Sequence, residues 1–487
     1  WDAMVTERAS YPKGRRRQSL QSELPNAAFQ LEGLEKLWKD GQQVRELASL
    51  LEGLGAYGVT ASFFCYDRTD GDVQTARALI SRAAASPKTR EIPDLVVLTE
   101  PVVRADLTSL GSSSGRTLLF HDPEDEALVE VARGVDSLEL VPCSSTGEIM
   151  TSTSIFQRIA ASHLQLHSEQ KETSRPVFVV GHIMKQSRSF ALSRQGLLHL
   201  EVCDGVCFVP VDEAAPIRQQ QERFKFDVLI HKASDWIVHS TGHPKASLAL
   251  PPLFESLASS ALRWLDSVDA TMPVLSRTEM HKLLLELARP EGGLSHRLIL
   301  PVTDSFTDRT NLEARTPFII KSNAACGVSF SHNMIIVRSA DKVALNTALE
   351  KCYGDYRDLV MQDLMDHEGY EAKVYCIGRA VHIAKRTLSS KARGDEHRPV
   401  YAFDSLRAKN RSPAQEDSTI SGEDMDFLHE CAAQLRRKLG LRLFGFDALK
   451  VKGSGKLAII DVNYFPSYNG IPEAREDLHQ ALVNNNM

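Results

Sequence analysis

The sequence predicts a chain of mixed α/β and α+β structure, and three observations favour this fold class. In the first third, short apolar runs alternate with patterns of helical spacing, which is typical of a parallel α/β layer fold. After residue 298, apolar runs of strand length become frequent. The length of 487 residues allows about three structural units. We therefore expect domains over residues 1–170, 175–297 and 298–487.

The first domain is predicted from its apolar spacing and its punctuation. Residues 27–54 carry leucines at broadly helical spacing and predict a helix that ends at Gly53. Strands are expected over 59–66, 94–98, 116–120 and 138–141, with helices over 72–85 and 125–133. The polar stretch 163–174 predicts a linker to the next domain.

The remainder of the chain predicts more strands and a few helices. Strands are expected over 177–181, 206–211, 227–231, 318–321, 334–337, 359–364, 372–377 and 381–385. Helices are expected over 244–268, 278–288 and 424–439, and Gly440 marks the end of the last one.

Composition limits the possible partners. With 25% charged and 43% hydrophobic residues, the chain is of ordinary globular type, and a net charge of −6 argues against a general nucleic-acid binder. No apolar run approaches the roughly 18 residues of a membrane span. The eight cysteines form no CxxC pair, so we expect reduced thiols. These features predict a cytoplasmic protein, with the nucleus as a second location, that binds neither nucleic acid nor membrane.

The run LRLFGFDALKVKGSGKLAIIDVNYFP after Gly440 predicts a β-hairpin whose loop is 453–455. If Lys452 pairs with Lys456, Asp447 lies directly opposite Asp461. Period-two alternation then places Asn463 on the same face. The hairpin therefore brings three oxygen-bearing side chains together.

These three side chains predict a magnesium site. Opposed carboxylates with Cβ atoms about 5 Å apart repel one another unless a cation lies between them. Oxygen ligands without Cys or His favour Mg²⁺, which also takes ligands from substrate phosphates. Either acid alone would more often cap a turn or end a strand. It is the combination of Asp447, Asp461 and Asn463 across one hairpin that favours a metal.

Upstream, Lys321 ends a short apolar strand and is followed by a loop of small residues and then by His332. Small residues let a loop backbone approach phosphates, while an ammonium group neutralises them. On its own this signal is weak, because a strand-end lysine is often a solvated charge and the Walker pattern is absent.

The segment from Gln362 to Lys373 predicts a strand, a bend and a second strand that connect two lobes. A second cationic cluster, Lys385 and Arg386, ends a later strand. Magnesium carboxylates and strand-end cations, without a P-loop or the HRD and DFG motifs of protein kinases, favour the ATP-grasp architecture.

Six segments carry a more specific resemblance: FIIKSNAACGVSFSH, MQDLMDHEGYEAKVY, FGFDALKV, IIDVNYFPSYNG, IMKQSR and VLIHKASD. In order and spacing they resemble the inositol 1,3,4-trisphosphate 5/6-kinases, also called inositol-tetrakisphosphate 1-kinases, over roughly residues 175–480. The additional N-terminal domain resembles that of the long plant-type members, which is haloacid-dehalogenase-like. Its catalytic aspartate motif is not recognisable here. The resemblance thus implies a degenerate haloacid-dehalogenase-like domain followed by an ATP-grasp kinase core.

The resemblance also implies the activity and its ligands. The chain would be a monomeric, ATP-dependent kinase that transfers the γ-phosphoryl group to a ring hydroxyl of inositol tris- or tetrakisphosphate, with two Mg²⁺ ions. The metal ligands would be Asp447, Asp461 and Asn463. Lys321, Asp461 and Arg386 would be catalytic.

The family's binding residues can be placed on this sequence. ATP contacts are implied for Arg277, Lys321, Gln362, Asp363, Leu364, Lys373 and Thr387. Inositol phosphate contacts are implied for Lys185, Lys232, His332, Lys373, Asn463 and Ser467. Ser467 stands where much of the family has glycine, and Thr387 stands where the family has serine.

Two other functions remain open from the sequence. An ATP-grasp carboxylate-amine ligase would share the metal site and the strand-end lysine. A catalytically silent inositol phosphate sensor would use its N-terminal domain to contact partners. The cations around Lys185 and Lys232 favour a polyphosphate over a carboxylate substrate, and the intact metal set argues against a silent sensor.

Overall fold

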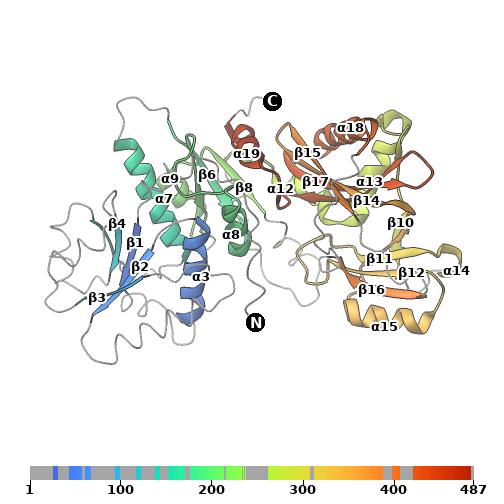
Figure 1. The fold of residues 1–487 in the computed structure, drawn as a ribbon, viewed down its shortest axis with the longest axis horizontal. Helices are drawn as coiled ribbons and strands as arrows, with labels where there is room; N and C mark the ends of the chain where they lie inside the picture. Colours follow the sequence, from blue (N-terminus) through green and yellow to red (C-terminus); the bar gives the residue numbers. More distant parts are fainter. Residues whose placement is uncertain are drawn as a thin grey trace, which may run out of the picture. The chain divides into compact units, whose positions relative to one another are not determined.

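The chain forms two compact units: Trp1–Gly181 with Lys185–Asp212, and His182–Met184 with Glu213–Met487. We refer to them as the N-terminal and C-terminal units (Figure 1). The computed structural model describes residues 26–30, 43–57, 61–66, 94–98, 117–121, 138–142, 152–169, 176–212, 215–232, 234, 236, 262–307, 312–387, 398–405 and 420–483. The predicted helices 72–85 and 125–133 lie outside these residues.

The N-terminal unit contains a parallel five-stranded sheet in the order β3-β2-β1-β4-β5. Its strands are β1 (Asn26–Gln30), β2 (Ala61–Tyr66), β3 (Asp94–Leu98), β4 (Thr117–His121) and β5 (Leu138–Pro142). The predicted parallel layer is therefore confirmed. The helix expected over 27–54 is wrong at its start, since β1 is a central strand. Pairing with two neighbouring strands outweighs a local helical pattern there.

The helical part of that segment is α3 (Gln43–Tyr57), and it continues past Gly53. Close packing explains the glycine. A Cβ atom at residue 53 would lie 2.1 Å from Cζ of Phe156 and 2.6 Å from Cζ of Phe190. The rings of Tyr57, Phe156 and Phe190 pack on one another with centroids 5.2 to 6.1 Å apart. Gly53 thus admits an aromatic cluster and does not end the helix.

The linker expected over 163–174 is also wrong over its first part, because α7 (Ser152–Glu169) is a helix throughout. Ile155, Phe156 and Ile159 bury its apolar face, and the buried His163 continues that face into the polar stretch. Polar residues on the remaining surface of the helix made this segment resemble a linker.

A three-stranded sheet has the order β7-β6-β8, with strands β6 (Phe178–Ile183), β7 (Val206–Pro210) and β8 (Val228–His231). Helices α8 (Gln186–Arg194) and α9 (Ile217–Phe224) follow β6 and β7. The helix expected over 244–268 is wrong at 262–266, where Trp264 forms a parallel bridge with Leu229. Residues 244–261 lie outside the described part.

The C-terminal unit contains two five-stranded sheets, which confirms the predicted strands after residue 298. The first has the order β10-β13-β11-β12-β16 and the second β15-β14-β17-β18-β9. The first consists of β10 (Thr303–Phe306), β11 (Phe318–Ser322), β12 (Asn333–Val337), β13 (Leu359–Asp363) and β16 (Val400–Asp404). The second consists of β9 (Leu298–Ile299), β14 (His367–Ile377), β15 (Ala380–Thr387), β17 (Leu443–Val451) and β18 (Leu457–Tyr464).

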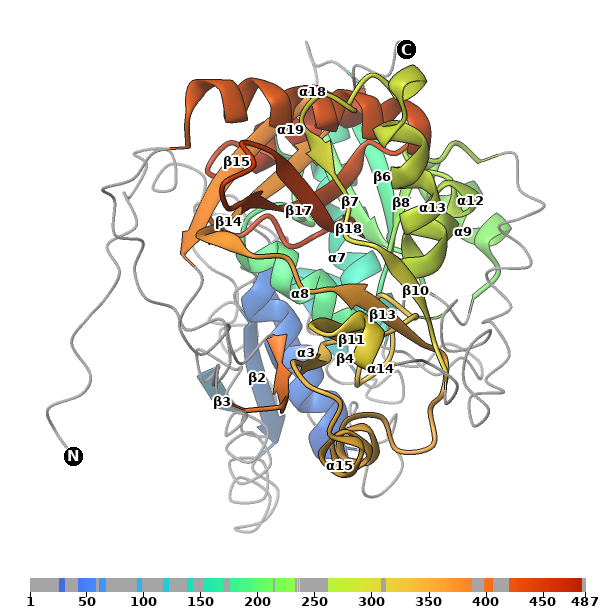
Figure 2. The ribbon, with the colours of Figure 1, turned by 90° about the vertical axis from the view of Figure 1, so that its right-hand side faces the viewer.

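Helices cover these two sheets. Short segments α12 (Val268–Thr271), η1 (Met272–Leu275), η2 (Pro290–Gly292) and α14 (Leu312–Arg315) accompany the longer α13 (Arg277–Ala288), α15 (Lys342–Tyr353), α18 (Gly422–Leu439) and α19 (Ala474–Val483). Both α18 and α19 pack on β14 (Figure 2). Ser421 caps α18, and Gly440 ends it with φ 69°, as its sequence predicts.

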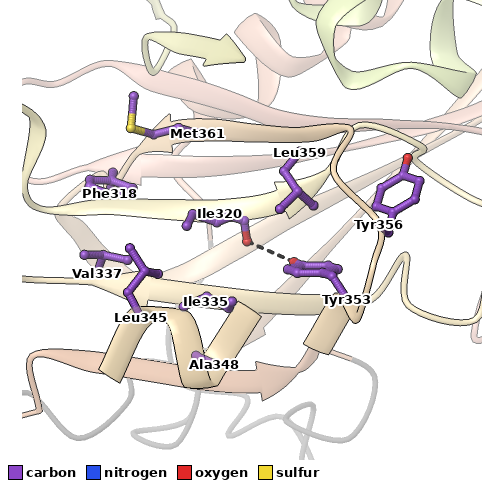
Figure 3. Close-up of a cluster of buried hydrophobic side chains, with 10 residues drawn as sticks. All are labelled: Phe318, Ile320, Ile335, Val337, Leu345, Ala348, Tyr353, Tyr356, Leu359 and Met361. Atoms are coloured by element: carbon purple, nitrogen blue, oxygen red, sulfur yellow. Dashed lines mark hydrogen bonds between the residues drawn. The ribbon is translucent and has the colours of Figure 1, made fainter. Parts of the chain in front are cut away.

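The core beneath the first sheet decides where Lys321 points. Phe318 and Ile320 of β11 pack against α15 in a cluster with Met361 and Leu359 of β13 (Figure 3). The hydroxyl of Tyr353 donates to the Ile320 carbonyl at 3.3 Å. Because successive side chains of a strand alternate, Lys321 and Gln362 must lie on the opposite face of the sheet.

Two further sequence expectations can be compared with the described residues. No helix among them is long and apolar enough to cross a bilayer. Cys203, Cys207, Cys326, Cys352, Cys376 and Cys431 form no disulfide.

We expect Gly53→Ala to destabilise the N-terminal unit by about 1–3 kcal/mol, because the new methyl group overpacks the aromatic cluster. Helix propensity alone would predict a gain of about 1 kcal/mol. Chemical denaturation followed by circular dichroism measures the difference. Gly422→Ala is the matched control, since nothing lies within 4 Å of a Cβ atom at that helical position. Equal stability of the two variants would contradict the packing argument.

Candidate functional site

The β17–β18 hairpin confirms the predicted pairing of Asp447 with Asp461, but by a different route. Near the turn Lys450 pairs with Leu457, so the expected pairing of Lys452 with Lys456 is wrong. A β-bulge follows, in which Ile460 is an extra residue on β18. The bulge shifts the register by one residue and brings the two aspartates opposite each other.

The three predicted metal ligands share one face of the second sheet. The amide of Asn463 donates to Oδ2 of Asp461 at 3.0 Å, which places these two side chains together. Lys373 of β14 is the cross-strand neighbour of Asp447, and its Nζ lies 3.2 Å from Oδ1 of Asp447 in an ion pair. Lys373, Asp447 and Asp461 therefore form one row across three strands.

This oxygen set fits a hard divalent cation. Oδ1 of Asp461 is buried and has no hydrogen-bond partner among the described residues, and Oδ1 of Asp447 has only its ion pair with Lys373. Buried carboxylate oxygens normally find a partner, so these oxygens keep acceptor capacity that a cation would satisfy. The described residues contain no group of three His, Cys, Asp or Glu side chains that could hold a metal. Two carboxylates and one amide are thus what the β17–β18 hairpin offers.

Asp266 anchors the start of β17. Its carboxylate accepts hydrogen bonds from the amides of Arg442, at 2.6 Å, and Leu443, at 3.0 Å. Burial raises the pKa of this carboxyl group to about 6, while the two amide bonds oppose the shift. The contact fixes the end of β17 from which Asp447 is positioned.

Lys321 is the next-to-last residue of β11, which continues one residue past the predicted end to Ser322, and it faces the acidic row. It is 6% exposed, and its ammonium group donates to Oε1 of Gln362 at 2.6 Å. Burial, with the nearby charge of Arg277, lowers the pKa of Lys321 to about 8; the charges of Asp461, Asp447 and Glu371 oppose this shift. Lys321 of one sheet thus lies within electrostatic reach of the carboxylates of the other.

Arg277, predicted to contact ATP, is the first residue of α13 and is 5% exposed. Its Nη1 donates to the carbonyls of Ser322 at 2.6 Å and Ala324 at 2.9 Å, and its Nη2 donates to the carbonyl of Ser331 at 3.3 Å. The guanidinium group therefore contacts both ends of the loop between β11 and β12.

The predicted connector, Gln362 to Lys373, runs from β13 into β14 as expected. The amide of Asp363 donates to the Val302 carbonyl at 3.0 Å, and that of Leu364 to the Pro317 carbonyl at 3.3 Å. Both amides are therefore engaged in this conformation. A base bound by this segment would use its carbonyl oxygens or replace one of these bonds.

The cationic pair at the end of β15 divides between two faces. Arg386 pairs across the strands with Glu371 and donates to Oη of Tyr375 at 3.1 Å. Lys385 lies instead over the ring of Tyr370, 4.2 Å from its centroid. Only Arg386 shares the face of Lys373, because the two cations are consecutive strand residues. Thr387 ends β15, and its side chain lies outside the described part.

Glu371 is the charged residue of this face that sequence reasoning missed. It is 6% exposed, two residues before Lys373, and opposite Arg386. The period-two spacing from Lys373 was the signal that could have found it. No ligand motif includes it, and the sequence alone places it in the connector between β13 and β14.

The remaining predicted residues lie in several places. The ammonium group of Lys232, 7% exposed, donates to the carbonyl of Tyr464, the residue that directly follows Asn463.

His332 ends the loop after β11, and its carbonyl accepts from the amide of Ser405 at 2.9 Å. Ser467 lies beyond β18, where its carbonyl accepts from the amide of Asn469 at 2.7 Å. Lys185 belongs to the N-terminal unit, where it caps α8.

Comparison with known proteins bears on this site. Residues 297–484, which include both sheets, match the inositol 1,3,4-trisphosphate 5/6-kinase ATP-grasp domain. The resemblance predicted from the motifs is confirmed. This part of the C-terminal unit is therefore similar to that ATP-grasp domain.

Individual relatives carry the same family name. Inositol-tetrakisphosphate 1-kinase 6 of Oryza sativa subsp. indica is 26% identical over 328 residues, 61% of this chain and 57% of that protein. Inositol-tetrakisphosphate 1-kinase of Danio rerio is 26% identical over 322 residues, 61% of this chain and 76% of that protein. The match thus spans little more than half of the rice relative.

Solved structures are more distant. The VanG D-Ala:D-Ser ligase from Enterococcus faecalis is 12% identical, with a TM-score of 0.41, over 63% of this chain and 100% of that one.

We expect the ammonium group of Lys321 to titrate near pH 8 in the nucleotide-free protein, against 10.5 for an ordinary lysine. The folded pKa lies below the unfolded value, so between pH 8 and 10.5 the unfolded chain binds the extra proton. This group therefore makes the free energy of unfolding rise with pH across that window. Carbon-13 NMR of labelled lysines measures the titration, and Lys321→Met assigns the resonance. A resonance that does not titrate below pH 10 would contradict the result.

Proposed function

We propose that this chain is an inositol polyphosphate kinase that transfers the γ-phosphoryl group of ATP to a ring hydroxyl of inositol tris- or tetrakisphosphate. The observation that carries the proposal is the row of Lys373, Asp447 and Asp461 facing Lys321, within a region that matches the ATP-grasp domain of these kinases. The named relatives are kinases, which disfavours the carboxylate-amine ligase.

Asp447, Asp461 and Asn463 would hold Mg²⁺. Bound Mg²⁺ neutralises charge on the β- and γ-phosphates, which is the main requirement of a loose phosphoryl-transfer transition state. The buried, unpartnered Oδ1 of Asp461 supports this role. Lys373, now paired with Asp447, would retain that carboxylate's orientation until nucleotide binds.

Lys321 and Arg386 would hold the phosphates from the two sides. Lys321 is fixed by Gln362, whose Nε2 in turn donates to Oγ1 of Thr303 at 3.2 Å. Such a chain of hydrogen bonds keeps the ammonium group aligned before the substrate arrives. A triphosphate would favour the charged form of Lys321, and its binding would therefore raise the pKa of that lysine. Arg386 faces the same space from β15.

The acceptor would be bound by cations around the end of β18. Lys232 contacts the backbone directly after Asn463, and Ser467 follows in the same segment. An inositol phosphate carries several dianionic groups, so charge-assisted hydrogen bonds would supply both affinity and orientation. His332 would contribute from the end of the β11–β12 loop.

For residues 1–170 we propose a haloacid-dehalogenase-like domain without phosphatase activity, as the first of three domains over 1–170, 175–297 and 298–487. Its strand order, with β1 between β2 and β4, is the doubly wound arrangement, which supports the α/β part of this proposal.

Asp461→Asn should lower phosphoryl transfer to inositol tetrakisphosphate by at least about 100-fold, because one lost metal ligand removes several kcal/mol of transition-state stabilisation. Radiolabelled ATP measures the transfer, and thermal denaturation checks the fold. Asp426→Asn, an exposed acid on α18, is the control and should retain full activity. Near-normal turnover of Asp461→Asn would remove the metal assignment.

Lys232→Ala should raise the KM for inositol phosphate by at least about tenfold, the equivalent of one charge-assisted hydrogen bond, and leave the KM for ATP nearly unchanged. Steady-state kinetics with each substrate varied in turn separates the two constants. The opposite pattern would place Lys232 at the nucleotide.

A further inference from the structure

Arg277 occupies a position that is unfavourable for a cation. It is the first residue of α13, where the helix dipole is positive, and it is 5% exposed. The oxygens that accept its hydrogen bonds are neutral: three carbonyls and, at 3.4 Å, the hydroxyl of Ser322. Burying a guanidinium group here costs free energy, so the contacts that it makes must compensate for the cost.

The compensating contacts of Arg277 are with the loop between β11 and β12. The loop contains three small residues, Ala324, Ala325 and Gly327, the last with φ 80°, and near its end the ring of Phe330 lies 4.5 Å from that of Tyr356. Arg277 contacts Ser322 at its start and Ser331 at its end. One planar group therefore ties both ends of a loop that follows Lys321 directly.

The backbone around Arg277 strengthens the same junction. Its own amide donates to the Asn323 carbonyl at 2.9 Å, and the Ala325 amide donates to the Leu275 carbonyl at 2.9 Å. Oδ1 of Asn323 accepts from the amide and the hydroxyl of Thr278, each at 3.0 Å. The start of α13 and the start of the loop are thus joined by main-chain and side-chain bonds.

We propose that Arg277 is a positioning residue, which holds the loop 322–331 in one conformation through three carbonyl oxygens so that the loop backbone and Lys321 present themselves together to the triphosphate. The role in ATP binding rests on the proposed kinase function, whereas the fastening of the loop does not. Lysine cannot replace arginine here. Nη1 binds the carbonyls of Ser322 and Ala324 while Nη2 binds that of Ser331, and a single ammonium nitrogen cannot reach all three acceptors.

The test compares Arg277→Lys and Arg277→Ala with Arg289→Lys and Arg289→Ala, which alter an exposed cation at the other end of α13. Hydrogen exchange of peptides covering 322–331, measured without nucleotide, reports the loop directly. Both Arg277 variants should exchange at least about tenfold faster there, the equivalent of one lost charge-assisted bond, and the Arg289 variants should match the wild type. Added guanidinium ion should partly restore protection to Arg277→Ala.

Kinetics then addresses the link to ATP. Both Arg277 variants should raise the KM for ATP by a similar factor and leave the KM for inositol phosphate within about twofold. If Arg277→Lys keeps wild-type exchange and a wild-type KM, its charge alone suffices and the proposal is overturned. Should Arg277→Ala not fold, the lysine variant decides. If the wild type transfers no phosphate to inositol phosphates, the kinase proposal fails, while the exchange experiment still decides the fastening of the loop.

Discussion

The pairing of Asp447 with Asp461 across β17 and β18 is the constraint on which the rest of the site depends. Two carboxylates facing each other in a sheet are unfavourable unless positive charge lies nearby. Lys373, on the adjacent strand, supplies part of it through its ion pair with Asp447, and Lys321 approaches from the other sheet. The site thus sets two negative carboxylates beside two positive ammonium groups. A metal-nucleotide complex would bring a cation for the carboxylates and phosphates for the lysines.

Two sheets with different cores make this balance possible. The first sheet packs Phe318 and Ile320 against α15, which turns Lys321 towards the opposite face. In the second, the acidic row shares a face with Arg386 and Glu371, while helices α18 and α19 pack on β14. Because each sheet is held by its own hydrophobic core, the charged side chains are buried between two rigid sheets. That rigidity is what alignment of a phosphoryl group requires.

Several sequence predictions failed for a common reason: they treated local composition as decisive. The segment 27–54 has helical spacing, yet β1 gains hydrogen bonds from two neighbouring strands. The local pattern predicts a helix end at Gly53, although the small size of this residue instead accommodates Phe156 and Phe190, which are distant in sequence. The first part of the polar stretch, residues 163–169, belongs to α7 because one face of that helix is buried. In each case the deciding partner lies far along the chain.

The sequence by itself determined the residue types of the site, the alternation that puts Asp461 and Asn463 on one face, and the family resemblance. These follow from local periodicity and from motifs that need no long-range contact. Only the tertiary structure decided that a bulge at Ile460 restores the aspartate pairing, that Arg277 fastens a loop, and that Glu371 lies opposite Arg386. Register shifts, buried cations and cross-strand neighbours depend on which strands meet, and no local pattern specifies that.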